Sequence, residues 1–206
     1  MNQIIECEQN SPEWFQARLG IPTASMFDAV MAKGRGGGES KGRRTYMLKL
    51  IGERMTGEPA DSYSNPHMER GKIMEEEARN AYVFMQDAEP VKVGFIRNGE
   101  KGCSPDSLLG NDGLLEIKTK LPHLQLDVIL SGQMPPEHMA QVQGQIWVAE
   151  REWCDFVSYC PKLPLFVQRI FRDDNYIKNL SDAIDEFLSD MEKLQAKIGT
   201  PNTGGA

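Results

Sequence analysis

Residues 104–118 have the sequence Ser-Pro-Asp-Ser-Leu-Leu-Gly-Asn-Asp-Gly-Leu-Leu-Glu-Ile-Lys. The central run Gly-Asn-Asp-Gly has apolar residues on both sides, a pattern that predicts a β-hairpin. Asp106 and Glu116 then lie nearly opposite each other across this hairpin. Because side chains alternate along a strand, Glu116 and Lys118 share one face and Ile117 takes the other. Two carboxylates and a lysine therefore converge on one small patch.

Such a patch suits metal-dependent hydrolysis of a phosphodiester. Mg²⁺ prefers oxygen ligands, and it usually binds one or two protein carboxylates together with water and substrate phosphate. A metal held by Asp106 and Glu116 would lower the pKa of a bound water and offset the charge that builds on the phosphate. Lys118 would orient the attacking water or contact the scissile phosphate. A polar surface hairpin with a Glu-x-Lys pair is the alternative interpretation of these residues alone.

A phosphate pocket is predicted nearer the N-terminus. The sequence predicts a short helix that ends near Gly20, followed by a second helix with Thr23 as its N-cap. Ser25 then falls in the first turn, where free backbone N–H groups and the helix dipole attract anions. Arg18 can add a bidentate guanidinium. The alternative is that Arg18 is a surface helix end and Ser25 an ordinary first-turn serine.

Apolar residues recur at helical spacing over residues 69–86 and predict an amphipathic helix. Within its run of three glutamates, Glu75 lies beside the apolar face and can approach the sheet. Glu76 and Glu77 point elsewhere, and we expect them to form a solvated acidic face.

A helix predicted from about residue 136 to 149 brings His138, Gln141 and Gln145 onto one side. The neutral amide of Gln141 could hold the scissile phosphate or a nucleophilic water without competing for the metal. His138 could reach a phosphate, or it could be a solvated or core-edge histidine.

These residues resemble the PD-(D/E)XK nuclease core, and the whole chain resembles the phage lambda exonuclease family of viral recombinases, also called YqaJ-type. The segments that carry the resemblance follow the family's order: residues 18–25, 70–79, 104–118, and 139–143 with 147–148. The resemblance implies an α/β, restriction-endonuclease-like (PD-(D/E)XK) core with a central mixed β-sheet flanked by helices. His138 departs from the tyrosine of the lambda-type enzymes, which leaves its role open.

The resemblance also implies roles for individual residues. The implied catalytic group is Asp106, Glu116, Lys118, Glu75 and Gln141. Asp106 and Glu116 would bind Mg²⁺, which Mn²⁺ could replace, with the backbone carbonyl of Ile117 as a further ligand. Arg18 and Ser25, with Thr23 between them, would bind the 5′-phosphate of the digested strand. Met68 aligns with a loop that contacts the separating end of the duplex, where it could act as an apolar wedge; a buried core methionine is the alternative.

The activity implied by the resemblance is Mg²⁺-dependent 5′-to-3′ digestion of one strand of linear double-stranded DNA, which leaves a 3′ overhang for recombination. The implied partners are linear duplex DNA with 5′-phosphate ends, two further copies of the chain in a homotrimeric ring, and a phage-type single-strand annealing protein. Two alternatives stay open. An endonuclease with the same core would cut closed circular DNA, and a non-catalytic DNA-end-binding factor would not need Asp106 or Glu116.

The formal net charge of −7 is unusual for a DNA-binding protein, because duplex affinity rests largely on lysine and arginine. Basic residues, however, cluster between residues 33 and 54, beginning in a glycine-rich segment. Arg35 and Arg43 in this region are predicted to contact DNA phosphates. An exposed linker with a basic helix is the equal alternative.

Length and composition favour one soluble domain over residues 1–199 with a polar tail at 200–206. Hydrophobic residues make up 40% of the sequence, and no apolar run approaches membrane-spanning length. With no secretory signal pattern and no C-x-x-C pair among four cysteines, we expect a cytoplasmic phage or prophage protein in a bacterial host. Strands are predicted over 91–97, 153–159 and 165–171, and a last helix over 174–197.

Overall fold

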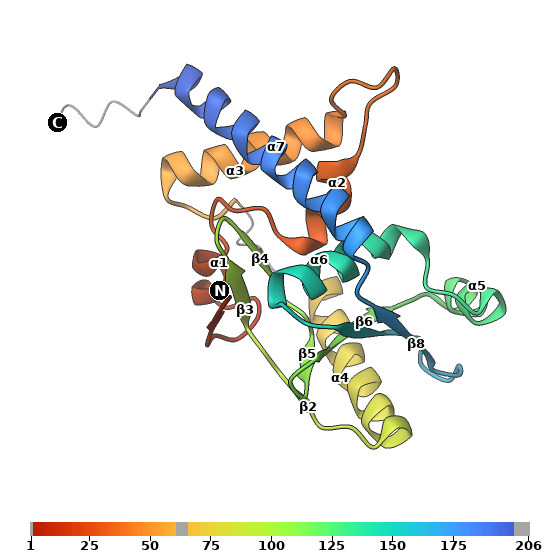
Figure 1. The fold of residues 1–206 in the computed structure, drawn as a ribbon. Coiled ribbons are helices and arrows are strands. Elements are labelled where there is room, and N and C mark those ends of the chain that lie inside the picture. Colours follow the sequence, from red (N-terminus) through yellow and green to blue (C-terminus); the bar gives the residue numbers. More distant parts are fainter. Residues whose placement is uncertain (1, 61–65, 200–206) are drawn as a thin grey trace.

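The protein combines two β-sheets with surrounding helices (Figure 1). The computed structural model describes residues 2–60 and 66–199, except for the side chains of residues 66–72. The predicted tail at 200–206 and the side chain of Met68 lie outside the described residues. The helices are α1 (Pro12–Ala17), α2 (Phe27–Met31), α3 (Lys41–Thr56), α4 (Pro66–Gln86), α5 (Pro122–Ser131), α6 (Met139–Ala149) and α7 (Asp174–Ile198), with 3-10 turns η1 (Ala24–Met26) and η2 (Pro136–His138).

The larger sheet has the order β2-β5-β6-β7-β8, and its β6–β7 pair is parallel while the other pairs are antiparallel. The predicted mixed sheet is therefore confirmed. A smaller antiparallel sheet has the order β1-β3-β4. The strands are β1 (Gln3–Ile5), β2 (Pro90–Val91), β3 (Phe95–Asn98), β4 (Lys101–Cys103), β5 (Ser107–Leu109), β6 (Gly113–Thr119), β7 (Trp153–Tyr159) and β8 (Phe166–Phe171).

The predicted hairpin around residues 106–116 is confirmed by β5 and β6. Ser107 pairs with Leu115, and the Asp106 backbone N–H donates to the Leu115 carbonyl at 3.0 Å. Asp106 therefore lies beside Glu116, as the turn chemistry predicts.

The prediction of one strand over residues 91–97 is wrong. Val91 ends β2 in the larger sheet, and Phe95 begins β3 in the smaller one. Gly94 lies at the crossing, where a Cβ would overlap the Cys7 backbone carbonyl. Alternating hydrophobicity marks an extended segment, but it does not reveal that the segment leaves one sheet for another.

The larger sheet buries apolar side chains on both faces. Leu115 and Ile117 pack toward α4, together with Ala78 and Tyr82 of that helix. Leu114 belongs to the other core, which includes the buried residues of α6 and α7. The alternation predicted for β6 is confirmed, and it directs Glu116 toward α6.

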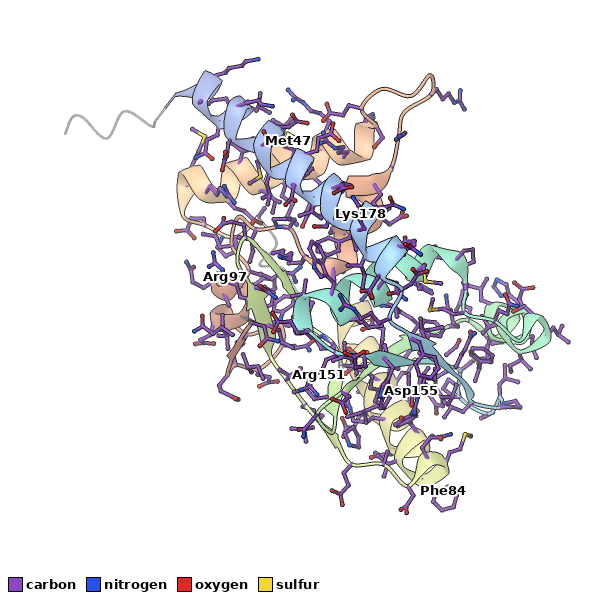
Figure 2. All side chains as sticks on the ribbon, viewed as in Figure 1. Met47, Phe84, Arg97, Arg151, Asp155 and Lys178 are labelled. Carbon is purple, nitrogen blue, oxygen red and sulfur yellow. The ribbon has the colours of Figure 1, made fainter. Side chains whose placement is uncertain are left out.

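Helices α3 and α7 form a layer of their own over α2 and α6 (Figure 1). Met47, labelled in Figure 2, is buried in the core beneath α7. Tyr46 stacks on Phe187 with ring centroids 5.7 Å apart. This layer extends the core well beyond the sheet.

Helix α4 is fixed to the opposite face of the sheet by a buried polar contact. The Tyr82 hydroxyl donates to the Asp155 carboxylate at 2.6 Å, and Arg169 donates two further hydrogen bonds of 2.8 Å to the same carboxylate. Because Asp155 lies in the centre of β7, this contact sets the position of α4 against the sheet.

Gly144 allows η1 to approach α6 closely, and we expect Gly144→Ala to lower the free energy of unfolding by about 1–3 kcal/mol through overpacking. A Cβ at this position would overlap the Phe27 ring and lie 3.4 Å from the Ala24 side chain. Urea unfolding measures the loss. Gly52→Ala is the matched control, because a Cβ at this position meets nothing within 4 Å. This substitution should stabilise α3 by about 0.5–1 kcal/mol. Equal effects at the two positions would contradict the packing argument.

Candidate active site

A cavity of about 220 Å³ joins the predicted metal patch to the predicted phosphate pocket. Its lining combines residues of α1, η1, β6, α6 and the segments around β1 and β5: Gln9, Asn10, Trp14, Arg18, Thr23, Ala24, Ser25, Ser104, Asp106, Glu116, Lys118, Gln141 and Gln145. Residues that are more than 100 positions apart in the sequence thus meet in one place. Glu75 lines a neighbouring cavity, of about 290 Å³, that shares Gln9, Asn10 and Asp106 with the first.

Glu116 is the buried centre of this site. It is only 2% exposed, yet both of its carboxylate oxygens have donors. Oε1 accepts from Lys118 Nζ and from Gln141 Nε2, each at 2.6 Å. Oε2 accepts from Gln145 Nε2 at 2.6 Å. A lysine and two amides therefore compensate the loss of water around this charge.

Gln145 is a site residue that the sequence prediction did not include. It follows Gln141 by one helical turn, and this i, i+4 spacing on the predicted inner side of the helix was the available signal. Its contact with Glu116 could not be known without the packing of α6 on the sheet.

Asp106 lies at the cavity wall and keeps part of its surface accessible. Its Oδ2 accepts from the Ile117 backbone N–H at 2.5 Å, so the Ile117 backbone adjoins the carboxylate. Enclosure by the surrounding protein, followed by the nearby charges of Glu116 and Glu75, raises the pKa of Asp106 well above its ordinary value. The site thus concentrates negative charge that a bound cation would relieve.

The donor set fits a magnesium ion. Two carboxylates and an adjacent backbone carbonyl are oxygen ligands, and Mg²⁺ typically takes one or two protein carboxylates and fills the remaining positions with water and substrate. No group of three or more His, Cys, Asp or Glu side chains that could hold a metal occurs within residues 2–60 and 73–199. Asp106, Glu116 and the Ile117 carbonyl are the groups that would hold the ion, and water and phosphate would complete its coordination.

Lys118 carries a positive charge at this site. Burial lowers the pKa of Lys118, but the negative charges of Glu116, Asp106 and Glu75 together raise it by more. The pKa of Lys118 is therefore higher than that of an ordinary lysine. Lys118 is therefore suited to hold a phosphate or a water by charge rather than to accept a proton.

Arg79 links Glu75 to the Asp106 loop, and it is a second residue that the sequence prediction missed. It is only 5% exposed. Its guanidinium donates to Glu75 at 2.6 Å, to the Asp106 carbonyl at 3.2 Å and to the Ser107 hydroxyl at 3.1 Å. The Glu-x-x-x-Arg spacing on the helix was the signal for the first of these contacts.

The predicted exposed acidic face is confirmed for Glu76 and Glu77, both of which are exposed. Glu76 bonds Arg79 and Lys92, both at 2.6 Å, and the hydrogen bond from Lys92 lowers its pKa below the ordinary value. Glu77 is exposed and accepts from the Tyr159 hydroxyl at 3.2 Å.

The end of the cavity that is predicted to bind phosphate is built from side chains rather than from a helix terminus. The expected second helix is the 3-10 turn η1 followed by the short α2, and the Thr23 side chain makes no capping hydrogen bond. Its hydroxyl instead accepts from Arg18 at 3.1 Å and lies 3.4 Å from the Ser25 hydroxyl. Arg18 also stacks on Trp14 at 4.0 Å, and the Trp14 indole N–H donates to Ser104 at 2.7 Å. These contacts orient Arg18, Thr23 and Ser25 in the cavity.

His138 lies at the edge of the core and is not among the residues that line this cavity. Its ring stacks on Phe156 at 5.2 Å, and Nε2 lies 3.0 Å from Lys120 Nζ. Burial, followed by the charges of Lys120 and Lys118, lowers the pKa of His138 to about 4. These contacts favour the core-edge alternative over the phosphate contact.

The two arginines that were predicted to contact DNA phosphates, Arg35 and Arg43, differ in their exposure. Arg35 is exposed in the glycine-rich loop. Arg43 is largely buried and bonds Glu39 at 2.8 Å and Asp190 at 2.9 Å, so it joins α3 to α7. A DNA contact by Arg43 would require both ion pairs to break. The charge pattern alone did not reveal that α7 supplies its partner.

Comparisons with known proteins show the family and the fold of the chain. A family model described as YqaJ-like viral recombinase domain matches residues 13–152. The alkaline exonuclease LHK-Exo from Laribacter hongkongensis is 35% identical over 91% of this chain and 96% of its own, with a TM-score of 0.81. LHK-Exo in complex with dAMP is 36% identical over the same shares, with a TM-score of 0.83.

Two further relatives are more limited. A phage related exonuclease from Haemophilus somnus 129PT shares the fold, with a TM-score of 0.65 at 13% identity over 87% of this chain and 96% of its own. The ExoD protein of Escherichia coli (strain K12) is 31% identical over 65 residues, which are 30% of this chain and 75% of that protein. The likeness to LHK-Exo confirms the predicted α/β, restriction-endonuclease-like fold. Among the described helices, none has the length and apolar character to cross a membrane.

Proposed function

Because the chain belongs to the YqaJ-like viral recombinase family, we propose that it is a Mg²⁺-dependent exonuclease that digests one strand of linear double-stranded DNA from its 5′ end. The observation that carries this proposal is the common cavity of Asp106, Glu116 and Lys118 with Arg18 and Ser25. The first three residues supply hydrolytic chemistry and the other two supply recognition of a phosphate. Relatives that are exonucleases by name, LHK-Exo among them, support the same class of reaction.

Each site residue has a distinct task in this proposal. Asp106, Glu116 and the Ile117 carbonyl hold Mg²⁺, or Mn²⁺ in its place, and the bound ion supplies charge neutralisation at the phosphate and an activated water. Lys118 holds the scissile phosphate or the attacking water by its charge. Gln141 donates its amide N–H to Glu116 and so positions that carboxylate. Glu75, held by Arg79, adds negative charge beside Asp106.

The resemblance implies the direction of digestion, and the predicted phosphate pocket supports it. A terminal 5′-phosphate held by Arg18 and Ser25 would place the first phosphodiester bond of that strand near Asp106 and Glu116, because both groups line one cavity. Release of a deoxynucleoside monophosphate is the expected result, and LHK-Exo binds such a molecule, dAMP. The remaining 3′ overhang would be the substrate of a phage-type single-strand annealing protein in the cytoplasm of a bacterial host. A homotrimeric ring around the duplex would compensate for the net charge of −7.

The proposed reaction is tested by incubating linear duplexes labelled at either end with Mg²⁺ or with EDTA. Mg²⁺-dependent release of mononucleotides from the 5′ end supports the proposal. Cutting of closed circular DNA would favour the endonuclease alternative, and end binding without cleavage in Mg²⁺ or Mn²⁺ would favour the non-catalytic one.

We expect Arg18→Gln to lower kcat/KM for duplexes with a 5′-phosphate by about 10- to 100-fold, because a charge-assisted hydrogen bond contributes about 1.5–3 kcal/mol. Duplexes with a 5′-hydroxyl should lose much less, since they lack the group that Arg18 would bind. Arg172→Gln is the matched control, because Arg172 pairs with Asp174 outside the cavity. Equal losses on both substrates would contradict the assignment of Arg18 to the 5′-phosphate.

A further inference from the structure

In the buried side-chain amide of Gln145, the nitrogen has a hydrogen-bond partner and the oxygen has none. Gln145 is 1% exposed, and its Nε2 donates to Glu116 Oε2 at 2.6 Å. Its Oε1 is the only buried side-chain nitrogen or oxygen without a hydrogen-bond partner in the part of the chain whose side chains the structure describes. Gln145 also lines the cavity of the candidate active site.

The orientation of this amide follows from its neighbour. If the amide turned by 180°, its carbonyl oxygen would face the Glu116 carboxylate, which has no hydrogen to donate when ionised. The hydrogen bond to Glu116 would then become a repulsive contact between two acceptors. Nε2 therefore belongs on Glu116, and Oε1 is left to find a donor elsewhere.

An enclosed water molecule at the cavity wall is the donor that fits, because Oε1 itself is buried. Leaving a buried acceptor unpaired costs about 1–3 kcal/mol. The side-chain donors nearest to Glu116, on Lys118 and Gln141, are already directed at Glu116 Oε1. The cavity is polar, and its volume of about 220 Å³ is ample for ordered water.

We propose that Gln145 is a positioning residue of the Mg²⁺ site, which fixes Glu116 through Nε2 and holds an ordered water beside the two carboxylates through Oε1. This inference rests on the proposed metal-dependent function. It differs from the role of Gln141, because Gln145 contacts the other oxygen of Glu116 and its own unpaired amide oxygen is buried. Together the two amides hold both oxygens of the metal-binding carboxylate, so the ion would meet a ligand whose orientation is already set.

Removal of both contacts is tested by Gln145→Leu. Hydrogen-bonding partners of metal ligands typically contribute about 10- to 100-fold to metal affinity or activity. We therefore expect the Kd for Mn²⁺, measured by titration calorimetry without DNA, to rise by about 10- to 100-fold. The Mg²⁺ concentration for half-maximal digestion should rise in parallel. Gln145→Met, which keeps the length of the side chain, gives the same comparison if the leucine variant does not fold.

Gln143→Leu is the matched control. Gln143 lies on the same helix and is 2% exposed, but it donates to the Phe171 carbonyl at 2.8 Å and accepts from the Asp173 N–H at 3.0 Å. Its loss should lower the unfolding temperature in EDTA and leave the affinity for Mn²⁺ unchanged. If the role of Gln145 were purely structural, Gln145→Leu would likewise lower the unfolding temperature and leave the affinity for Mn²⁺ unchanged.

The outcomes separate this inference from the proposed function. Suppose that the wild type binds Mn²⁺ and digests DNA, and that a folded Gln145→Leu or Gln145→Met variant binds Mn²⁺ with the same affinity. This result would overturn the role of Gln145 and leave the proposed function in place. Wild-type protein that neither binds Mn²⁺ nor cleaves DNA would overturn the proposed function and this inference with it. Weaker Mn²⁺ binding in the Gln145 variants, with normal binding in Gln143→Leu, supports the inference.

Discussion

Asp106→Asn should reduce Mg²⁺-dependent digestion of linear duplex DNA by at least about 10³-fold while the protein stays folded. The metal ion contributes several kcal/mol of charge stabilisation in reactions of this kind, and each 1.4 kcal/mol corresponds to about a tenfold change in rate. Asparagine keeps the shape of the side chain and an oxygen for the Ile117 N–H, but it removes the charge that holds the ion. Binding of Mn²⁺, measured by calorimetry, should be lost together with the activity.

The same variant should be more stable than the wild type in EDTA at neutral pH. Burial and the charges of Glu116 and Glu75 raise the pKa of Asp106 above the ordinary 3.8. The folded protein therefore binds this proton more tightly than the unfolded chain, and ionisation destabilises the metal-free fold as the pH rises above 3.8. Thermal unfolding in EDTA should show an advantage for Asp106→Asn that shrinks as the pH falls toward this value. A variant that is active, or a wild type that is the more stable of the two in EDTA, would contradict this account of the site.

Lys118→Ala should reduce kcat by about 10²- to 10³-fold, which is the typical cost of removing one group directed at developing charge in a water-poor site. Unlike Asp106→Asn, this variant keeps both of the carboxylates that would bind the metal. We therefore expect it to bind Mn²⁺ and to bind duplex ends while cleaving them slowly. Calorimetry and single-turnover digestion separate the two effects.

Two controls define the role of Lys118. Lys118→Arg keeps the positive charge but replaces a compact ammonium group by a planar guanidinium group. We therefore expect this variant to recover only part of the wild-type rate. Lys178→Ala removes a lysine that lies exposed on α7 (Figure 2) and pairs with Asp182, and it should leave the rate unchanged. A Lys118→Ala variant that digests DNA at the wild-type rate would remove this residue from the proposed mechanism.

The sequence predicted the hairpin and its polar face because both depend on local rules. Turn residues set the β5–β6 hairpin, and strand alternation placed Glu116 and Lys118 on one face with Ile117 on the other. Strand β7 and helix α7 were predicted almost to the residue, because their apolar residues repeat with the period of the element they form. The resemblance to a nuclease family added the mixed sheet and the family itself.

Other features depend on partners that are distant in the sequence. The segment 91–97 divides between two sheets at Gly94, where the Cys7 backbone leaves no room for a side chain. Arg43 belongs to the packing of α3 on α7 because Asp190 lies across from it. The helix expected after Pro22 is a 3-10 turn and a short α2, and Thr23 directs its hydroxyl to Arg18 instead of capping a helix.

The sequence by itself thus predicted which groups would carry the proposed chemistry: two carboxylates, a lysine, and an arginine with a serine for the phosphate. Only the tertiary structure decided that the two sets share one cavity, that Arg79 ties Glu75 to the Asp106 loop, and that Gln145 completes the surroundings of Glu116. The physical reason is that periodicity and turn chemistry act over a few residues, whereas a buried carboxylate takes its donors from whichever elements pack against it. Those elements are chosen by the whole core, so no local pattern records them.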